Sequence, residues 1–230
     1  MRLAFITDIH ADVKTLVEAL RQIDKMGCDL TVCGGDLVDL GWYPDATIKL
    51  IRDRKIACVR GNHDRWLLER LRVPASRRKD VEEWLPNPED TQFLAALPTS
   101  WSATLLGIRV AVHHASPPSD MDGIYPDSAR GSDVRRWLDQ ARADVLLVGH
   151  THIPFSLSIP GRGMIANPGA LLRDIGDDGA LIYNPATGGF DQGIVPEGGT
   201  FGILELPSLD FTVHRASDGT EVEIMRNTLF

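Results

Sequence analysis

The first 60 residues alternate between short apolar runs and stretches with helical periodicity. Apolar runs at 3–7, 30–33 and 56–60 predict three buried strands. Between them, apolar residues recur every three or four positions in 12–25, which predicts an amphipathic helix. The segment 44–54 predicts a second helix with a proline at its start. This rhythm of strand, helix and strand indicates a parallel sheet with right-handed crossovers.

The pattern changes after the third predicted strand. Residues 65–97 are predicted to form short helices broken by prolines, including an amphipathic helix at 77–84, and we expect this segment to act as a cap. Farther along, we predict a hairpin, one more helix and a series of short strands that form or extend a second sheet. The hairpin strands are 102–105 and 108–114, the helix is 133–143, a buried strand is 144–148, and the late strands are 180–183, 202–206, 211–214 and 221–225. Because no repeat or linker interrupts the chain, we expect one α/β domain over 1–230.

Polar side chains follow five of the predicted strands. In open α/β sheets, ligands bind at the carboxyl edge of the strands. Neighbouring strand ends lie only about 5 Å apart, so residues distant in sequence can meet there. The residues concerned are Asp8 and His10 after the first strand, Asp36 after the second, Asn62, His63 and Asp64 after the third, His114 at the end of the hairpin, and His150 and His152 after 144–148.

The residue types at these strand ends suit a metal site. Carboxylate, imidazole and amide donors fit Mn²⁺, Fe or Zn²⁺, and no thiolate accompanies them. In extended backbone, alternate side chains share a face, so we expect the D-x-H and H-x-H pairs each to reach one site. The alternative for Asp8 and His10 is capping of the helix that follows, and Asp36 could cap a turn. The whole set favours metal binding over these separate roles.

Composition limits the partners and the cellular compartment that we expect for a protein with such a site. The net charge of −8 argues against bulk nucleic-acid binding, but bound cations would still allow a phosphate substrate. The three cysteines lack CxxC spacing, so we expect core thiols and a reducing compartment. No signal peptide and no membrane-length apolar segment is evident, which predicts a cytoplasmic protein without membrane association. The sequence leaves the oligomeric state open.

Six short blocks carry a family resemblance. They are D-x-H at 8–10, G-D at 35–36, G-N-H-D at 61–64, H-A-S-P at 114–117, G-H-T-H at 149–152 and N-P-G-A at 167–170. In this order they resemble the calcineurin-like metallophosphoesterase superfamily, and the last block resembles its small bacterial and archaeal phosphodiesterase-like branch. The resemblance implies a two-sheet β-sandwich core flanked by helices.

The resemblance also implies roles for individual residues around two divalent metal ions. Mn²⁺ is the first candidate, with Fe, Zn²⁺ or Ni²⁺ as alternatives. His63 would lie beside the phosphate and protonate the leaving alkoxide or stabilise charge on the phosphoryl oxygens, and Asp64 would orient His63 or a metal ligand. Asp8, His10 and His152 would hold one metal, Asn62, His114 and His150 the other, and Asp36 would bridge them.

The expected reaction is hydrolysis of a small phosphate ester, with a phosphodiester as the first choice and a metal-activated water as nucleophile. Asn62 and His63 would contact the substrate. Arg60 is a further candidate, with a surface or ion-paired role as its alternative, and so is Arg173, which follows the N-P-G-A block. The alternatives are a phosphomonoesterase acting on a nucleotide or phosphoprotein, and a non-catalytic metal-binding scaffold. Leu40 stands where protein serine/threonine phosphatases have an arginine, which weakens the phosphoprotein alternative.

Overall fold

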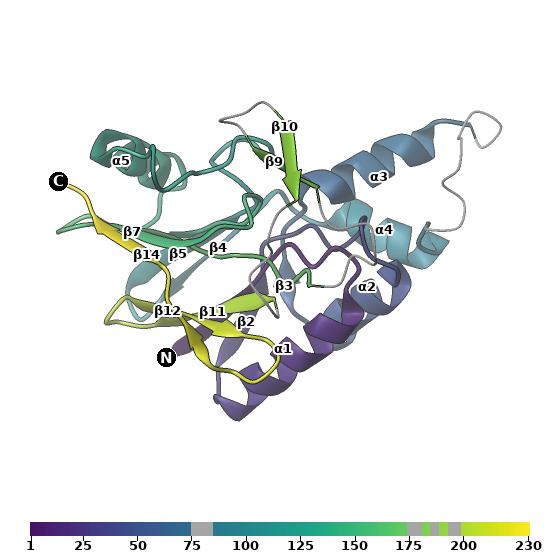
Figure 1. The fold of residues 1–230 in the computed structure, drawn as a ribbon, viewed down its shortest axis with the longest axis horizontal. Helices are drawn as coiled ribbons and strands as arrows, with labels where there is room; N and C mark the ends of the chain where they lie inside the picture. The colour runs from purple at the N-terminus through teal and green to yellow at the C-terminus, as the bar shows by residue number, and fades with distance from the viewer. Residues whose placement is uncertain (75–84, 174–180, 185–188, 193–198) are drawn as a thin grey trace.

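Two mixed six-stranded sheets form the centre of the molecule (Figure 1). The computed structural model describes residues 1–74, 85–173, 181–184, 189–192 and 199–230. Five helices are described besides the sheets: α1 (Val13–Lys25), α2 (Pro44–Asp53), α3 (Asn62–Arg72), α4 (Pro88–Ala96) and α5 (Gly131–Gln140). A separate two-stranded ribbon pairs β9 (Leu181–Asn184) with β10 (Gly189–Gln192). The predicted α/β fold with a two-sheet core and flanking helices is confirmed.

The first sheet combines three strands from the N-terminal part of the chain with three from its C-terminal part. Its strands β1, β2 and β3 run parallel, and β11, β12 and β13 extend the sheet antiparallel from β1. In spatial order the strands are β13 (Glu221–Val222), β12 (Asp210–Arg215), β11 (Thr200–Glu205), β1 (Arg2–Ile6), β2 (Leu30–Cys33) and β3 (Ala57–Cys58).

The second sheet begins with the predicted hairpin. β4 pairs antiparallel with β5, and β5, β6 and β8 then run parallel to one another. In spatial order the strands are β14 (Met225–Thr228), β7 (Pro154–Ile159), β8 (Gly163–Pro168), β6 (Val145–Leu147), β5 (Ile108–His113) and β4 (Ser100–Leu105).

The strand alternation places one apolar layer between the sheets and one outside each sheet. In β1, Leu3 and Phe5 join the cluster between the two sheets, whereas Ala4 and Ile6 join the cluster beneath the helices of the first sheet. This period of two is the geometry of a strand buried on both faces. Helix α5 covers the outer face of the second sheet, where Val134 and Leu138 are buried. The sandwich thus fixes the relative positions of all the strand ends that carry polar residues.

The late strands correct one sequence prediction. Strands 202–206 and 211–214 were expected in a second sheet, but β11 and β12 extend the first sheet. The predicted strand 221–225 is divided, because β13 pairs with β12 in the first sheet and β14 pairs with β7 in the second. Apolar alternation shows that a segment is a strand, but the partner of that strand depends on contacts far away in sequence.

The predicted helical segment 65–97 contains α3 and α4, which pack together. Helix α3 already begins at Asn62, so three of the expected site residues, Asn62, His63 and Asp64, lie in its first turn. The expected helix at 77–84 lies outside the described residues. Whether the segment acts as a cap, and whether 1–230 is one domain, remain predictions. Across the described ranges, no helix combines the length and apolar character needed to cross a bilayer.

Candidate active site

Loops from both sheets meet at one edge of the sandwich. The ends of β1, β2 and β3 in the first sheet face the ends of β5 and β6 in the second, and all seven expected metal ligands lie in the segments that follow. Ligand atoms of three overlapping triplets lie within 4.8 Å of one another. The triplets are Asp8, His10 and His152; His10, Asp36 and His63; and Asp8, Asp36 and His114.

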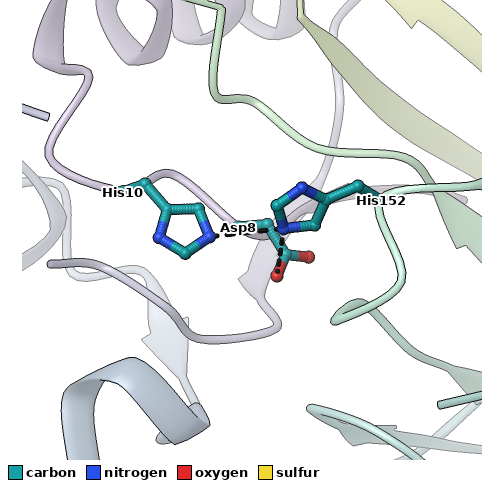
Figure 2. A group of neighbouring side chains, drawn as sticks. All are labelled: Asp8, His10 and His152. Atoms are coloured by element: carbon teal, nitrogen blue, oxygen red, sulfur yellow. Dashed lines mark hydrogen bonds and ion pairs between the residues drawn. The ribbon is translucent and has the colours of Figure 1, made fainter. Parts of the chain in front are cut away.

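Asp8, His10 and His152 form what we call the first donor group (Figure 2). The His152 Nε2 atom lies 3.3 Å from Asp8 Oδ1 and 3.3 Å from His10 Nε2. His10 Nδ1 lies 3.3 Å from the Val38 carbonyl oxygen, to which it donates its proton. This hydrogen bond leaves the Nε2 lone pair of His10 facing the other two members of the group.

Asn62, His114 and His150 form the second donor group. The Asn62 Oδ1 atom lies 2.8 Å from His114 Nε2 and 2.9 Å from His150 Nδ1. His114 Nδ1 donates to the Gly34 carbonyl at 2.8 Å, so the Nε2 atom is again directed into the site. In both donor groups a backbone carbonyl of the loop after β2 fixes the imidazole.

Asp36 lies between the two donor groups. Its Oδ2 atom is 3.3 Å from His114 Nε2 and 3.7 Å from His10 Nε2. Its Oδ1 atom accepts a hydrogen bond from the His63 backbone N–H at 2.9 Å. The side chain is thereby held with a single oxygen, Oδ2, beside one imidazole of each donor group, where it could bridge two ligand sets.

The backbone that presents these ligands is not extended, so the geometric reason given for the D-x-H and H-x-H pairs is wrong. Asp8 and His10 have φ values of 51° and 49°, and His150 and His152 have φ values of 67° and 56°. Left-handed backbone costs roughly 1–2 kcal/mol for each such residue. Neighbouring loops hold it in place, because Asp8 N–H donates to Gly35 O and His10 N–H donates to Asp36 O. The pairs converge through this curled backbone rather than through strand alternation.

Two glycines allow the ligand loops to approach one another. A Cβ atom at Gly61 would lie 2.1 Å from Asp36 Oδ1, and one at Gly149 would lie 2.4 Å from Asp8 Oδ2. Any side chain at these positions would displace a candidate ligand. The close approach also lets the His150 N–H donate to Asp8 Oδ2 at 3.0 Å.

The acids of the site are buried without a basic side chain. Asp8 and Asp36 are 0% and 1% exposed, and among the described residues no arginine or lysine forms an ion pair with either. Burial opposes ionisation, but His152 and His114 outweigh it and lower the pKa of Asp8 and of Asp36, respectively. Burial lowers the pKa of His10 to about 3, so this imidazole is neutral and able to act as a ligand.

His114 supplies the positive charge that the acids would otherwise lack. Burial opposes its protonation, but the Asp36 carboxylate outweighs burial and raises the pKa of His114 to about 10. A divalent cation would provide the same counter-charge and displace this proton. Within the described part of the chain, the buried Nδ1 atom of His152 has no hydrogen-bond partner, which also leaves that imidazole free to turn a lone pair to a cation. The donor set therefore fits divalent metal ions.

The Asp64 carboxylate supports the loop that carries the candidate ligand Asp36, and this differs from a role in orienting the His63 side chain. Its carboxylate accepts hydrogen bonds from the backbone N–H groups of Asp36 (3.0 Å), Leu37 (2.9 Å) and Gly61 (2.9 Å). Burial and then the charge of Asp36 raise the pKa of Asp64 to about 6, against the effect of these hydrogen bonds. Of the two roles expected for Asp64, the geometry matches orientation of a ligand.

His63 is held by an acid that the sequence did not assign to the site. Its Nδ1 atom lies 3.0 Å from Asp39 Oδ2, and the same oxygen accepts a hydrogen bond from Arg70 Nη2 at 3.0 Å. Burial opposes protonation of His63, but the Asp39 hydrogen bond and the charge of Asp36 raise its pKa. The position of Asp39 three residues after Asp36, in G-D-x-V-D, was the available signal.

Asn167 explains why the N-P-G-A block accompanies the other blocks. Its Nδ2 donates to the Gly149 carbonyl at 2.9 Å and to Thr151 Oγ1 at 3.1 Å. These bonds clamp the loop that carries His150 and His152. The residue is fully buried, so the block supports the ligands without contacting a substrate.

The two arginines expected to contact substrate lie in different settings. The Arg173 guanidinium pairs with Glu18 of α1 at 2.7 Å, while its backbone N–H donates to Asp12 Oδ2. Arg60 precedes α3, and its backbone N–H donates to the Pro98 carbonyl. A substrate contact by either side chain remains a prediction. Asp12, rather than Asp8 or His10, is the residue that caps α1, because its side chain accepts from Thr15 N–H.

Comparisons with known proteins identify the fold and the family of the chain. An uncharacterized protein of Methanocaldococcus jannaschii is 29% identical over 195 residues, which cover 81% of this chain and 76% of that protein. A solved metallophosphoesterase from Sphaerobacter thermophilus has a TM-score of 0.67 at 23% identity, covering 97% of this chain and 89% of that chain. A solved archaeal phosphodiesterase has a TM-score of 0.52 at 14% identity, covering 93% and 98% of the two chains. At these identities the two structures establish a shared fold.

The sequence profile of one family spans the region where the ligands converge. The profile described as calcineurin-like phosphoesterase matches residues 1–154, which run from β1 to the end of the G-H-T-H loop. The match covers more than half of the chain and includes both donor groups. The chain belongs to the calcineurin-like phosphoesterase family and is a phosphoester hydrolase.

Proposed function

We propose that this hydrolase is a phosphodiesterase that uses two divalent cations, with Mn²⁺ as the first candidate and Fe, Zn²⁺ or Ni²⁺ as alternatives. The observation that carries the proposal is the pair of donor groups with Asp36 between them. The first donor group would hold one cation, the second would hold the other, and Asp36 would contact both. When bound, such cations supply Lewis acidity and lower the pKa of a water nucleophile.

In this proposal His63 is the general acid. Its Nδ1–H donates to Asp39, so the opposite ring nitrogen, Nε2, carries the proton that reaches the leaving alkoxide. Asp39 favours the protonated imidazole, as the raised pKa of His63 indicates. Asn62 lies one residue away in the same helical turn and would hold a cation and contact the substrate. Asp64 would keep Asp36 in place through its backbone bonds.

The charges around the site favour a diester over a monoester. A phosphomonoester dianion needs more positive charge than a diester monoanion. Three arginines in the neighbourhood are instead paired with acids: Arg65 with Asp120, Arg70 with Asp39 and Arg173 with Glu18. The similarity in fold to an archaeal phosphodiesterase is consistent with this preference. A phosphomonoesterase is the second candidate, and the complete donor set disfavours a non-catalytic scaffold.

The proposal also includes the kind of substrate and the cellular compartment. A net charge of −8 favours a small phosphate ester over a nucleic-acid polymer. The three cysteines are free thiols, two of them buried, which suits the reducing cytoplasm.

The test is hydrolysis of bis(p-nitrophenyl) phosphate by protein stripped with EDTA and then supplied with Mn²⁺. We expect activity only with Mn²⁺. For a diester that releases an alkoxide, such as dibenzyl phosphate, we expect a loss of about 100-fold or more in His63→Ala, the size of a general acid's contribution, and a smaller loss for the more acidic p-nitrophenol leaving group. His214→Ala is the matched control, because His214 lies on β12 and bonds Thr212 and the Gly219 carbonyl. Faster hydrolysis of p-nitrophenyl phosphate would favour the monoesterase. Full activity after both chelation and His63→Ala would contradict the proposal.

A further inference from the structure

Exposed apolar side chains gather on the loops that carry the site. Of the ten large hydrophobic residues exposed in the described part of the chain, five lie on the segments that follow β2, β5 and β6. They are Leu40, Trp42, Tyr43, Met121 and Ile153, with exposed fractions of 38% to 53%. Single exposed apolar residues need no explanation, but a group around a reaction centre indicates recognition of an apolar group.

The loop after Asp39 is fixed against the first donor group. A Cβ atom at Gly41 would lie 2.2 Å from the His10 carbonyl oxygen, and Tyr43 N–H donates to the Ala11 carbonyl at 3.2 Å. Leu40 has a φ of 67°, unfavourable for a branched side chain, and remains 46% exposed. The backbone thus holds an apolar side chain in solvent beside the acid that orients His63, which suits a binding role.

Helix α3 places an aromatic ring on the proposed general acid. The Trp66 ring meets the His63 ring at a centroid distance of 4.7 Å and an interplanar angle of 60°. The next side chain toward the N-terminus, Arg65, binds Asp120 through two hydrogen bonds of 2.6 and 3.0 Å. This pair ties α3 to the loop that carries Met121. In the proposed mechanism, a group that received the His63 proton would therefore leave next to Trp66.

The arginines beside Trp66 offer little charge to an anionic leaving group. The guanidinium of Arg70 is paired with Asp39 and that of Arg65 with Asp120. An uncharged flat ring needs no such charge. Stacking of a flat ring on an aromatic side chain contributes about 1–3 kcal/mol, or roughly 5- to 150-fold in binding.

We propose that Trp66, Leu40 and Trp42 bind the uncharged aromatic ring of a leaving group, so that the enzyme prefers phosphodiesters of alcohols that carry an aromatic ring, including nucleosides. The inference rests on the proposed phosphodiesterase function. The inference places the aromatic ring on the leaving group rather than on the group that stays on phosphorus. The reason is that His63 contacts both Trp66 and Asp39, and Asp39 adjoins Leu40 in sequence.

The test compares dibenzyl phosphate with bis(cyclohexylmethyl) phosphate in the presence of Mn²⁺. Both diesters are symmetrical, and their alcohols have similar size and acidity but differ in flatness. We expect wild-type kcat/KM to favour the dibenzyl ester about tenfold, a value within the range for ring stacking. Trp66→Leu and Trp42→Leu should each lower this preference to about threefold or less, and Trp66→Phe should retain most of it.

Trp137→Leu is the matched control, because Trp137 lies on α5 over the other sheet and packs in the cluster beneath that helix. It should leave the preference unchanged. If Trp66→Leu does not fold, the exposed Trp42 and the Trp66→Phe variant still decide the question. Equal rates for the two diesters, or a preference that survives both leucine variants, would overturn the inference and leave the hydrolase intact. Failure of the wild type to cleave any diester would instead contradict the proposed function.

Discussion

The two ends of the sandwich surround their acidic side chains in different ways. At the end where β5 and β6 finish, Asp8 and Asp36 are buried beside imidazoles and backbone N–H groups. At the end where the same strands begin, Asp144 pairs with Arg109 at 2.6 Å and Asp139 pairs with Arg162 at 2.8 Å, and each of these side chains is partly or largely exposed. Both ends belong to one core, so the packing of the sheets does not cause the difference.

The comparison separates what stability requires from what the site requires. The surface acids have guanidinium partners, and the hydrogen bond from Arg109 lowers the pKa of Asp144 to about 2. The buried acids have no such partner among the described residues, and five of the seven expected ligands, both acids included, adopt left-handed backbone at a cost in stability. Buried unpaired acids and strained backbone lower the stability of the fold, and they are expected at a site where a bound ligand offsets that cost. Substitutions at the two ends should therefore have very different consequences.

The largest effect is expected for Asp36→Asn at the buried end. The amide keeps the shape of the side chain and can still accept from His63 N–H, but it lacks the charge that a bridging ligand needs. Because loss of a residue that merely supports a metal ligand costs 10- to 100-fold, we expect kcat/KM with Mn²⁺ to fall about 100-fold or more. Steady-state kinetics alongside circular dichroism would check this. Activity within threefold of wild type would contradict the claim that the buried acids, unlike the surface acids, are needed for the reaction.

Asp64→Ala should reduce stability strongly at the same end. The substitution leaves three buried backbone N–H groups without an acceptor. Each unsatisfied group costs about 1–3 kcal/mol, so we expect a loss of about 3 kcal/mol or more. At roughly 2–4 °C per kcal/mol for a chain of this size, the melting temperature should fall by about 6 °C or more. An unchanged thermal unfolding curve would show that Asp64 does not support the Asp36 loop.

Asp39→Asn should change the pH profile more than the fold. Asp39 holds the pKa of His63 above its usual value, and a general acid works only while protonated. Activity is therefore lost as pH rises through this pKa, and removing the charge of Asp39 should move that alkaline limb to lower pH. Arg70→Gln is a control that keeps the contact between Asp39 and His63. A pH–rate profile whose alkaline limb does not move in Asp39→Asn would argue against His63 as the acid.

The smallest effect is expected for Arg109→Ala at the surface end. The Arg109–Asp144 pair is partly exposed, and such pairs contribute about 0–1 kcal/mol. The lowered pKa of Asp144 means that this contribution is present above the ordinary carboxyl pKa and is lost as pH falls toward about 2. Chemical unfolding at pH 7 should show a small difference from wild type, with kcat/KM unchanged. A large loss of activity would mean that the surface end is coupled to the site.

Local patterns were enough to predict the strands of the buried end and that the polar residues after them lie close together. Each block follows directly on an apolar run, and the rule that ligands bind at the carboxyl edge then brings the blocks together. The left-handed conformations of Asp8 and His10 were not predictable, because they depend on carbonyl groups of Gly35 and Asp36. The contact between Asp39 and His63 and the division of the late strands between the sheets likewise depend on contacts distant in sequence.

The location of bound Mn²⁺ tests the central claim most directly. Crystals grown with Mn²⁺ and measured by anomalous diffraction would place each cation without reference to activity. We predict two peaks, one contacting the first donor group and one contacting the second, with Asp36 contacting both. A single peak, or peaks away from Asp36, would contradict the two-cation site.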